Sequence, residues 1–433
     1  MYKCKLSGLV VILSSILLAG NAVATENRPV VEEVKIAQAD SISPAEATAQ
    51  EGGEAADYAG GGKPQKPMTQ LDPASIKLDP FAITPWVNLT SGSDDNVSLA
   101  PSVKTRSNYT MFNPSLAVEL KGGTQSYTAL YSGSFVRYAS SSLDNYNDNS
   151  LAFDAENSWA TRFNTLLHLD YSKGHDGRNS LVVGRNVELW HNSGLRAMAR
   201  YGAKGAQGQI EVEAGLNKKR YETNQATMSF FDVDTQNLAA SYFHRVGAGT
   251  QALVQVRDLR LSYLLSPLSS SVERRYLVGA QWEATAKTTG SFKIGKLTKS
   301  FNAGTVPSHS AVTWEGEVRW TPLTYSSLDF IVNKATNESS GIGNFMTTRQ
   351  ESLAWNHDWS SRVRTTLTLG SGKDSYQGVA QEDSRSNYGV KASYGIQRWL
   401  RVGAEIQQQK RDSTDPNYIY TRNLALFTLE GSI

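Results

Sequence analysis

Cysteine and long apolar runs are nearly missing from this chain of 433 residues. Its single cysteine is Cys4, so the rest of the chain can form no disulfide, thiolate metal site or cysteine nucleophile. After residue 24, no segment approaches the roughly 18 continuous apolar residues that a transmembrane helix needs. Neither sign of charge is in clear excess, because 43 basic and 41 acidic residues leave a formal net charge of +2. We therefore expect no nucleic-acid partner.

The first 24 residues have the order of a secretory signal peptide. Lys3 and Lys5 give a positive start, residues 9–19 are almost wholly apolar, and the small residues Ala22 and Ala24 suit signal peptidase. A membrane anchor is the alternative, but the apolar run is well short of the ~20 residues of a helical span. We predict cleavage after Ala24, which also removes Cys4.

Residues 25–80 have the composition of a disordered lead. Residues 25–62 contain eight acidic and two basic residues, and the stretch carries too little apolar surface to offset the entropy of ordering. We predict an acidic periplasmic lead or linker. Two interpretations stay open: a passive linker, or a periplasmic contact segment that partly plugs the following domain.

From residue 81 to residue 433, apolar and polar residues alternate with a period of two. Tyr276, Val278, Ala280 and Trp282, for example, alternate with Arg275, Gly279, Gln281 and Glu283. This period is typical of β-strands that have one apolar and one polar face. Gly and aromatic residues are frequent and mean hydropathy is −0.39, as in barrels that face lipid on one side and water on the other.

Short turns and longer polar loops alternate along this region. Turn signals occur at residues 121–123, 160–162, 203–205, 247–249, 287–289, 321–323, 360–362 and 397–399. They predict an all-β fold: a transmembrane antiparallel up-and-down β-barrel of about 18 strands, with 16 if the count is off by two. A periplasmic sandwich or propeller is the alternative, but the strands look too long and no blade motif recurs.

Large aromatic residues gather near the predicted turns, where a barrel has its interfacial girdle. The candidate girdle residues are Trp282, Trp314, Trp320, Tyr325, Trp355, Trp359 and Trp399.

The polar phase of the strands should face the interior of the barrel. Charges this numerous need water or one another, and a barrel of ~16–18 strands is wide enough for an aqueous channel. Their mixed signs argue against a strong ion filter. The candidate lumen-lining residues are Glu211, Glu213, Lys219, Glu283, Lys293, Glu315, Glu317, Arg319, Asp329, Arg362, Arg364, Lys391, Arg401 and Glu405.

Catalytic motifs are not found in the sequence. His175-Asp176 and His357-Asp358 are adjacent pairs, but neighbouring strand residues point to opposite faces, so neither pair is a ready dyad. We interpret His175 as a loop residue and His357 as a residue near a turn, both at the surface. Ser93-Asp94-Asp95-Asn96 and residues 144–148 are interpreted as solvated loop tips rather than calcium sites. We expect no enzyme, metal or cofactor.

Three motifs resemble those of a known family. Residues 84–87 and 92–101 (with Gly92-Ser93-Asp94-Asp95-Asn96-Val97), residues 276–290, and residues 355–360 resemble the β-barrel porins encoded with exopolysaccharide genes, termed EpsL-like. The likeness covers residues 81–433 and is strongest at residues 282–290. It implies an outer-membrane barrel that secretes a capsular or extracellular polysaccharide together with a periplasmic or outer-membrane polysaccharide-export protein.

We therefore expect a conduit for exopolysaccharide in the outer membrane of a Gram-negative bacterium. The expected partners are the polysaccharide, outer-membrane lipid and lipopolysaccharide, the export protein and the barrel-assembly machinery. A general or solute-specific diffusion porin is the first alternative. A barrel enzyme that modifies polysaccharide or lipid is the second.

Overall fold

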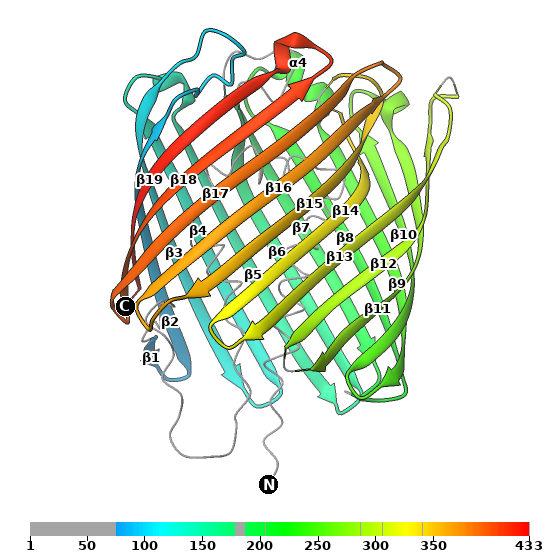
Figure 1. Ribbon diagram of the computed structural model, residues 1–433. Coiled ribbons are helices and arrows are strands. Elements are labelled where there is room, and N and C mark those ends of the chain that lie inside the picture. Colours follow the sequence, from blue (N-terminus) through cyan, green and yellow to red (C-terminus); the bar gives the residue numbers. More distant parts are fainter. Residues whose placement is uncertain are drawn as a thin grey trace.

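The computed structural model describes residues 75–177, 187–203, 205–285, 287–304, 306–339 and 341–432. The predicted signal peptide and residues 25–74 of the predicted lead lie outside these ranges. Eighteen antiparallel strands, β2 to β19, pair in chain order, and β19 pairs with β2 to close the sheet (Figure 1). The predicted closed barrel of about 18 strands is confirmed. No helix among the described residues is long and apolar enough to cross a membrane.

The barrel strands are mostly 14 to 16 residues long. Their bounds are β2 Phe81–Asp94, β3 Ser107–Gly122, β4 Gln125–Tyr138, β5 Tyr146–Ala160, β6 Phe163–Asp176, β7 Glu188–Tyr201, β8 Gly208–Tyr221, β9 Val233–Gly247, β10 Thr250–Tyr263, β11 Ser271–Thr285, β12 Thr288–Phe301, β13 His309–Leu323, β14 Ser326–Asn337, β15 Phe345–Asp358, β16 Val363–Gln377, β17 Glu382–Gln397, β18 Leu400–Ser413 and β19 Tyr420–Ser432.

Few other elements are present in the described ranges. Of the last six residues of the predicted lead, Ile76–Leu78 form the short strand β1, which pairs with the start of β2. The long connections carry the helix α4 (Gln225–Met228) and four 3-10 turns, namely η1 Ser142–Asp144, η2 Ser229–Phe231, η3 Pro267–Ser269 and η4 Pro416–Tyr418.

The two ends of the barrel differ, as the turn pattern predicts. Short turns lie at the end that also holds β1 and the end of β19, and longer connections lie at the opposite end (Figure 1). We call these the turn end and the loop end. The predicted turn at residues 321–323 is displaced, because β13 continues to Leu323 and β14 begins at Ser326. Pro322 is tolerated there because the strand pairing is already irregular beyond Trp320.

The inner wall is identified by contacts that skip strands. Arg257 on β10 reaches Glu315 on β13 across β11 and β12. Side chains converge over such a span only on the concave side of a closed sheet. With Arg257 and Glu315 placed on the inner wall, the strand register assigns alternate residues of each strand to the inner wall and to the outer face. Along β11, Glu273, Arg275 and Leu277 face inward, while Tyr276 and Val278 are exposed on the outside.

The outer face carries the exposed apolar side chains, as expected for a surface that meets lipid. These include Val212, Leu216, Val254, Tyr276, Val278, Val390, Ile406 and Phe427.

Most of the candidate girdle residues lie near the turn end, although their role at a membrane interface stays a prediction. Trp320, Tyr325, Trp359 and Trp399 are exposed there. Tyr325, Trp355 and Trp359 surround the ring of His357, with centroids 5.5, 5.4 and 4.4 Å away. Trp314 differs, because it lies nearer the loop end of β13 than the turn end and its ring contacts Lys334.

The family-like segment at residues 282–290 has a packing explanation. Trp282 pairs with Gly290 on the outer face, and its ring occupies the space where a Cβ of residue 290 would lie. That Cβ would also come within 2.5 Å of the carbonyl oxygen of Glu317. Glycine is therefore required at position 290.

The seam of the barrel explains a second family-like motif. Arg422 on β19 pairs with Asp94 on β2, with Arg422 Nε 3.0 Å from Asp94 Oδ2. Asn423 bonds Asp95 through its backbone and its side chain, at 2.7 Å each, and Asn96 donates to the carbonyl of Thr421 at 3.1 Å. The interpretation of this run as a solvated tip is wrong for Asp94 and Asn96, which are fully buried because they close the barrel.

Candidate functional site: the inner wall of the barrel

The middle of the inner wall holds a charged cluster on β10, β12 and β13. Arg257 donates to both carboxylate oxygens of Glu315, at 3.0 and 2.6 Å. Lys293 also contacts Glu315 and donates to Gln255 at 3.3 Å. Two cations thus share one carboxylate, which leaves this cluster with a net positive charge.

The structure gives each predicted lumen residue a position, while their role in lining a conducting path stays a prediction. Several form ion pairs. These are Glu211 with Arg200, Lys219 with Asp176, Lys293 with Glu315, Arg319 with Asp329, Arg364 with Asp358, and Lys391 and Arg401 with Glu430.

The remaining predicted lumen residues have weaker partners or are more exposed. Glu213 accepts from Asn237 at 3.1 Å, Glu405 accepts from Gln407 at 2.5 Å, and Arg362 donates to the Tyr394 hydroxyl at 3.4 Å. Glu283 and Glu317 are exposed. Both lie toward the turn end, on β11 and β13.

Toward the loop end, the inner wall holds buried ion pairs that sequence reasoning did not select. They are Glu273 with Arg275, Lys299 with Glu338, Asp374 with Arg385, Asp383 with Arg411, and Asp94 with Arg422. Some were missed because residues 371–385 are mostly polar, so no apolar phase marks them as strand, whereas β16 and β17 extend through most of this segment. The alternation of Asp383 and Arg385 with serines was the available signal.

Two histidines, His168 and His175, pair with an aspartate of a neighbouring strand rather than with an adjacent residue. His168 Nδ1 lies 2.7 Å from Asp154 Oδ1, and His175 Nδ1 lies 3.0 Å from both carboxylate oxygens of Asp148. The prediction of His175 as a surface loop residue is wrong. It is buried in β6, and its ring stacks on Tyr146 at 3.9 Å. No group of three or more metal-binding side chains occurs in the ranges described.

The loop-end mouth is partly filled by apolar side chains. Val97, from the connection between β2 and β3, packs with Tyr109, Met111, Val136 and Tyr138. A backbone bond from Val97 to Thr105 at 2.8 Å folds this connection back on itself. The connection therefore narrows the mouth from one side.

A second group of apolar residues faces inward on β10 to β12. Leu253, Leu259, Leu261, Leu277 and Leu297 are buried there. Apolar side chains therefore interrupt the polar phase of the strands in these two places. The inward leucines also explain why the phase of residues 253–265 is mixed in the sequence.

A belt of amide side chains crosses the seam of the inner wall. It comprises Asn387 on β17, Gln407 and Gln409 on β18, Asn88 on β2 and Asn113 on β3, and we call it the amide belt. Thr428 on β19 lies within it. Asn88 faces Asn113, and Asn387 faces Gln409, in the strand register.

Parts of the amide belt have unused hydrogen-bonding capacity. Both polar atoms of Gln409 are without a partner in the described ranges, as are Asn88 Nδ2, Asn113 Oδ1 and Gln407 Oε1. Gln409 is 2% exposed and Asn88 is fully buried. Buried amides normally find a partner. These atoms are themselves buried, so they lie within the wall rather than at its channel surface.

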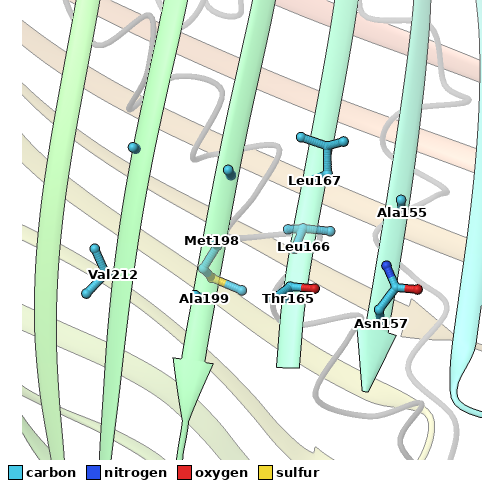
Figure 2. Close-up of a pocket in the computed structure, with 10 residues that line it drawn as sticks. Ala155, Asn157, Thr165, Leu166, Leu167, Met198, Ala199 and Val212 are labelled. Carbon is cyan, nitrogen blue, oxygen red and sulfur yellow. The ribbon is translucent and has the colours of Figure 1, made fainter. Parts of the chain in front are cut away.

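A shallow hollow in the wall lies apart from the amide belt. Figure 2 shows lining residues on four adjacent strands, among them Ala155, Leu167, Ala199 and Val212. Most of its lining residues have the outward phase, so the hollow belongs to the lipid-facing side of β5 to β8 rather than to the channel.

A closed barrel of 18 long strands with an apolar outer face and a charged, amide-bearing inner wall defines an outer-membrane β-barrel channel. Residues 69–431 match the family described as "Putative beta-barrel porin 2", and the chain belongs to that family. No curated protein matches the chain.

Solved structures with a similar fold are distant in sequence. A BenF-like porin from Pseudomonas fluorescens is 9% identical with a TM-score of 0.47, and 82% of this chain covers 100% of that chain. The outer membrane protein opdK from Pseudomonas aeruginosa is 12% identical with a TM-score of 0.46, covering 81% and 98%. The FrpB iron transporter from Neisseria meningitidis is 12% identical with a TM-score of 0.46, and the match spans 76% of this chain but 62% of the transporter.

Proposed function

We propose that the protein is a passive outer-membrane conduit for a secreted, hydroxyl-rich polymer, an exopolysaccharide or capsular polysaccharide. The observation that carries this proposal is the amide belt. Its half-buried members Asn387 and Gln407 present uncharged amide side chains at the wall. Uncharged amides exchange hydrogen bonds with sugar hydroxyls at small net gain, so a polymer slides past them rather than binding tightly.

The charge pattern of the inner wall also supports this proposal. Most of the inward charges are paired, as in the Arg257–Glu315–Lys293 cluster, so the wall is wet without a strong field of one sign. A neutral or weakly charged polymer would meet no strong electrostatic barrier in such a channel. A polysaccharide-export protein in the periplasm would deliver the polymer to the turn end.

A general diffusion porin is the second candidate. The exposed Glu283 and Glu317 near the turn end favour it, because charges in contact with water act on small ions and solutes. The two candidates differ in what is lost when the gene is deleted. A conduit loses surface polysaccharide with unchanged uptake of small solutes, whereas a porin loses uptake.

The test is complementation of a deletion strain. A variant with Asn387→Leu, Gln407→Leu and Gln409→Leu is expected to fold, because leucine removes unpaired polar atoms, but to secrete less polysaccharide than the wild type. The matched control replaces Gln251 and Gln281, which hydrogen bond each other at 2.5 Å, with leucine. The control is expected to retain secretion. Normal secretion by the deletion strain itself would refute the conduit.

A further inference from the structure

The outer face near the loop end carries an uneven distribution of charge. On β8 to β12, the outward positions beyond the apolar band hold Lys218, Arg220, Arg260, Arg274 and Lys296, against only Asp234 and Asp258 as acids among the described outward residues of these strands. On β15 to β18 the cations are matched by acids, in the pairs Arg349–Glu351, Lys373–Glu382 and Lys410–Asp412. The excess of positive charge on β8 to β12 therefore has no counterpart on β15 to β18.

Within this excess, Asp258 holds two arginines in place. Arg260 Nε lies 3.0 Å and Arg274 Nε 2.9 Å from the Asp258 carboxylate. Both arginine side chains are more than half exposed. Their terminal nitrogens donate to no other residue of the described ranges. The Asp258 carboxylate thus orients two guanidinium groups, and each guanidinium keeps N–H donors that can bind another anion.

Lys296 completes this group from the neighbouring strand. It lies opposite Tyr276, the next outward residue after Arg274 on β11, so Lys296 and Arg274 are diagonal neighbours on the outer face. Lys296 is exposed and has no ion-pair partner in the described ranges. Lys218 and Arg220 flank the group two strands away, on β8.

The position of these residues along the barrel axis indicates which layer of the membrane they contact. Trp282, the aromatic residue near the turn end of β11, lies eight residues from Arg274. At ~3.4 Å per residue and a tilt of ~40°, this is about 21 Å along the barrel axis, close to the ~25 Å apolar band of an outer-membrane barrel. Arg274, Arg260 and Lys296 therefore lie at the outer edge of the band, and their long side chains reach the headgroup level.

We propose that Arg260, Arg274 and Lys296 bind the phosphate groups of lipopolysaccharide lipid A in the outer leaflet. The site is separate from the inner wall, so it does not depend on what passes through the channel. Its bound lipid would cover the outside of β10 to β12.

The proposal is tested with the full-length protein purified in detergent. The probes are lipid A with its phosphates, dephosphorylated lipid A and phosphatidylglycerol, and bound lipid is counted by native mass spectrometry. The test variant carries Arg260→Gln, Arg274→Gln and Lys296→Gln. The matched control carries Arg349→Gln, Lys373→Gln and Lys410→Gln on the balanced side. Heat-modifiable migration on a gel checks that each variant is folded.

Phosphorylated lipid A is expected to bind the wild type and the control at least about tenfold more tightly than the test variant, since each Lys or Arg near a charged lipid surface contributes to attraction. Dephosphorylated lipid A should bind all three proteins equally weakly. An equal loss in the control variant, equal binding of dephosphorylated lipid A, or equal binding of phosphatidylglycerol by the wild type would overturn the proposal.

Discussion

The loop end and the turn end of the inner wall use charge in different ways. On β11, Glu273 and Glu283 face inward ten residues apart. Glu273 is 1% exposed, bound to Arg275 and Thr336, whereas Glu283 is exposed. Lys299 and Arg319 repeat the contrast on the neighbouring strands, with side chains 0% and 38% exposed. At the loop end the inward charges are buried and paired, as in a protein core. At the turn end they are exposed.

This difference teaches that an inward charge is not by itself a transport residue. A buried, fully paired charge is costly to desolvate and holds its partners in place, so its removal should affect folding. A charge in contact with water costs little and acts on passing ions, so its removal should affect conduction.

Glu273→Gln should give the largest effect. It leaves the buried Arg275 without its carboxylate partner, and breaking such a pair costs about 3–5 kcal/mol. We expect a clear fall in the temperature at which the barrel unfolds in detergent. Glu283→Gln, on the same strand and in the same phase, is the control and should change stability by less than about 0.5 kcal/mol. Equal shifts in the two variants would remove the distinction between the two ends.

Val97→Ser should have an intermediate effect, confined to the mouth. Val97 packs against Tyr109 and Met111, and exposing its side chain costs about 1–2 kcal/mol. We expect the connection between β2 and β3 to loosen, which single-channel recording would show as higher conductance. Val103→Ser is the control, since Val103 lies in the same connection but is 83% exposed. Unchanged conductance in Val97→Ser would mean that this connection does not narrow the channel.

Replacing Glu283 and Glu317 with lysine should have the smallest effect in energy. A unit charge ~10 Å from a monovalent ion in water changes its energy by about 0.4 kcal/mol, so after screening each reversal alters ion preference roughly twofold. The reversal potential in a salt gradient should shift toward anion preference, with an unchanged unfolding temperature. A shift in unfolding temperature without a shift in reversal potential would mean that Glu283 and Glu317 stabilise the fold, as the loop-end charges do, and do not act on passing ions.

Most of the fold could be predicted from the sequence, but less of the candidate site. The alternation at residues 276–283 shows which side chains share a face, and the turn signals give the strand number. The inward leucines at 253, 259 and 277 break the polar phase, so periodicity alone could not assign them. Asp383 and Arg411 lie near strand ends, where sequence patterns blur into loops.

Local sequence is enough to specify strands with one apolar and one polar face, because a period of two is a property of each strand alone. Only the tertiary structure decided which charges meet. Arg257 finds Glu315 58 residues away, and Arg422 finds Asp94 across the seam, 328 residues away. These pairs depend on strand register and on closure of the sheet, and both are set by the whole barrel at once.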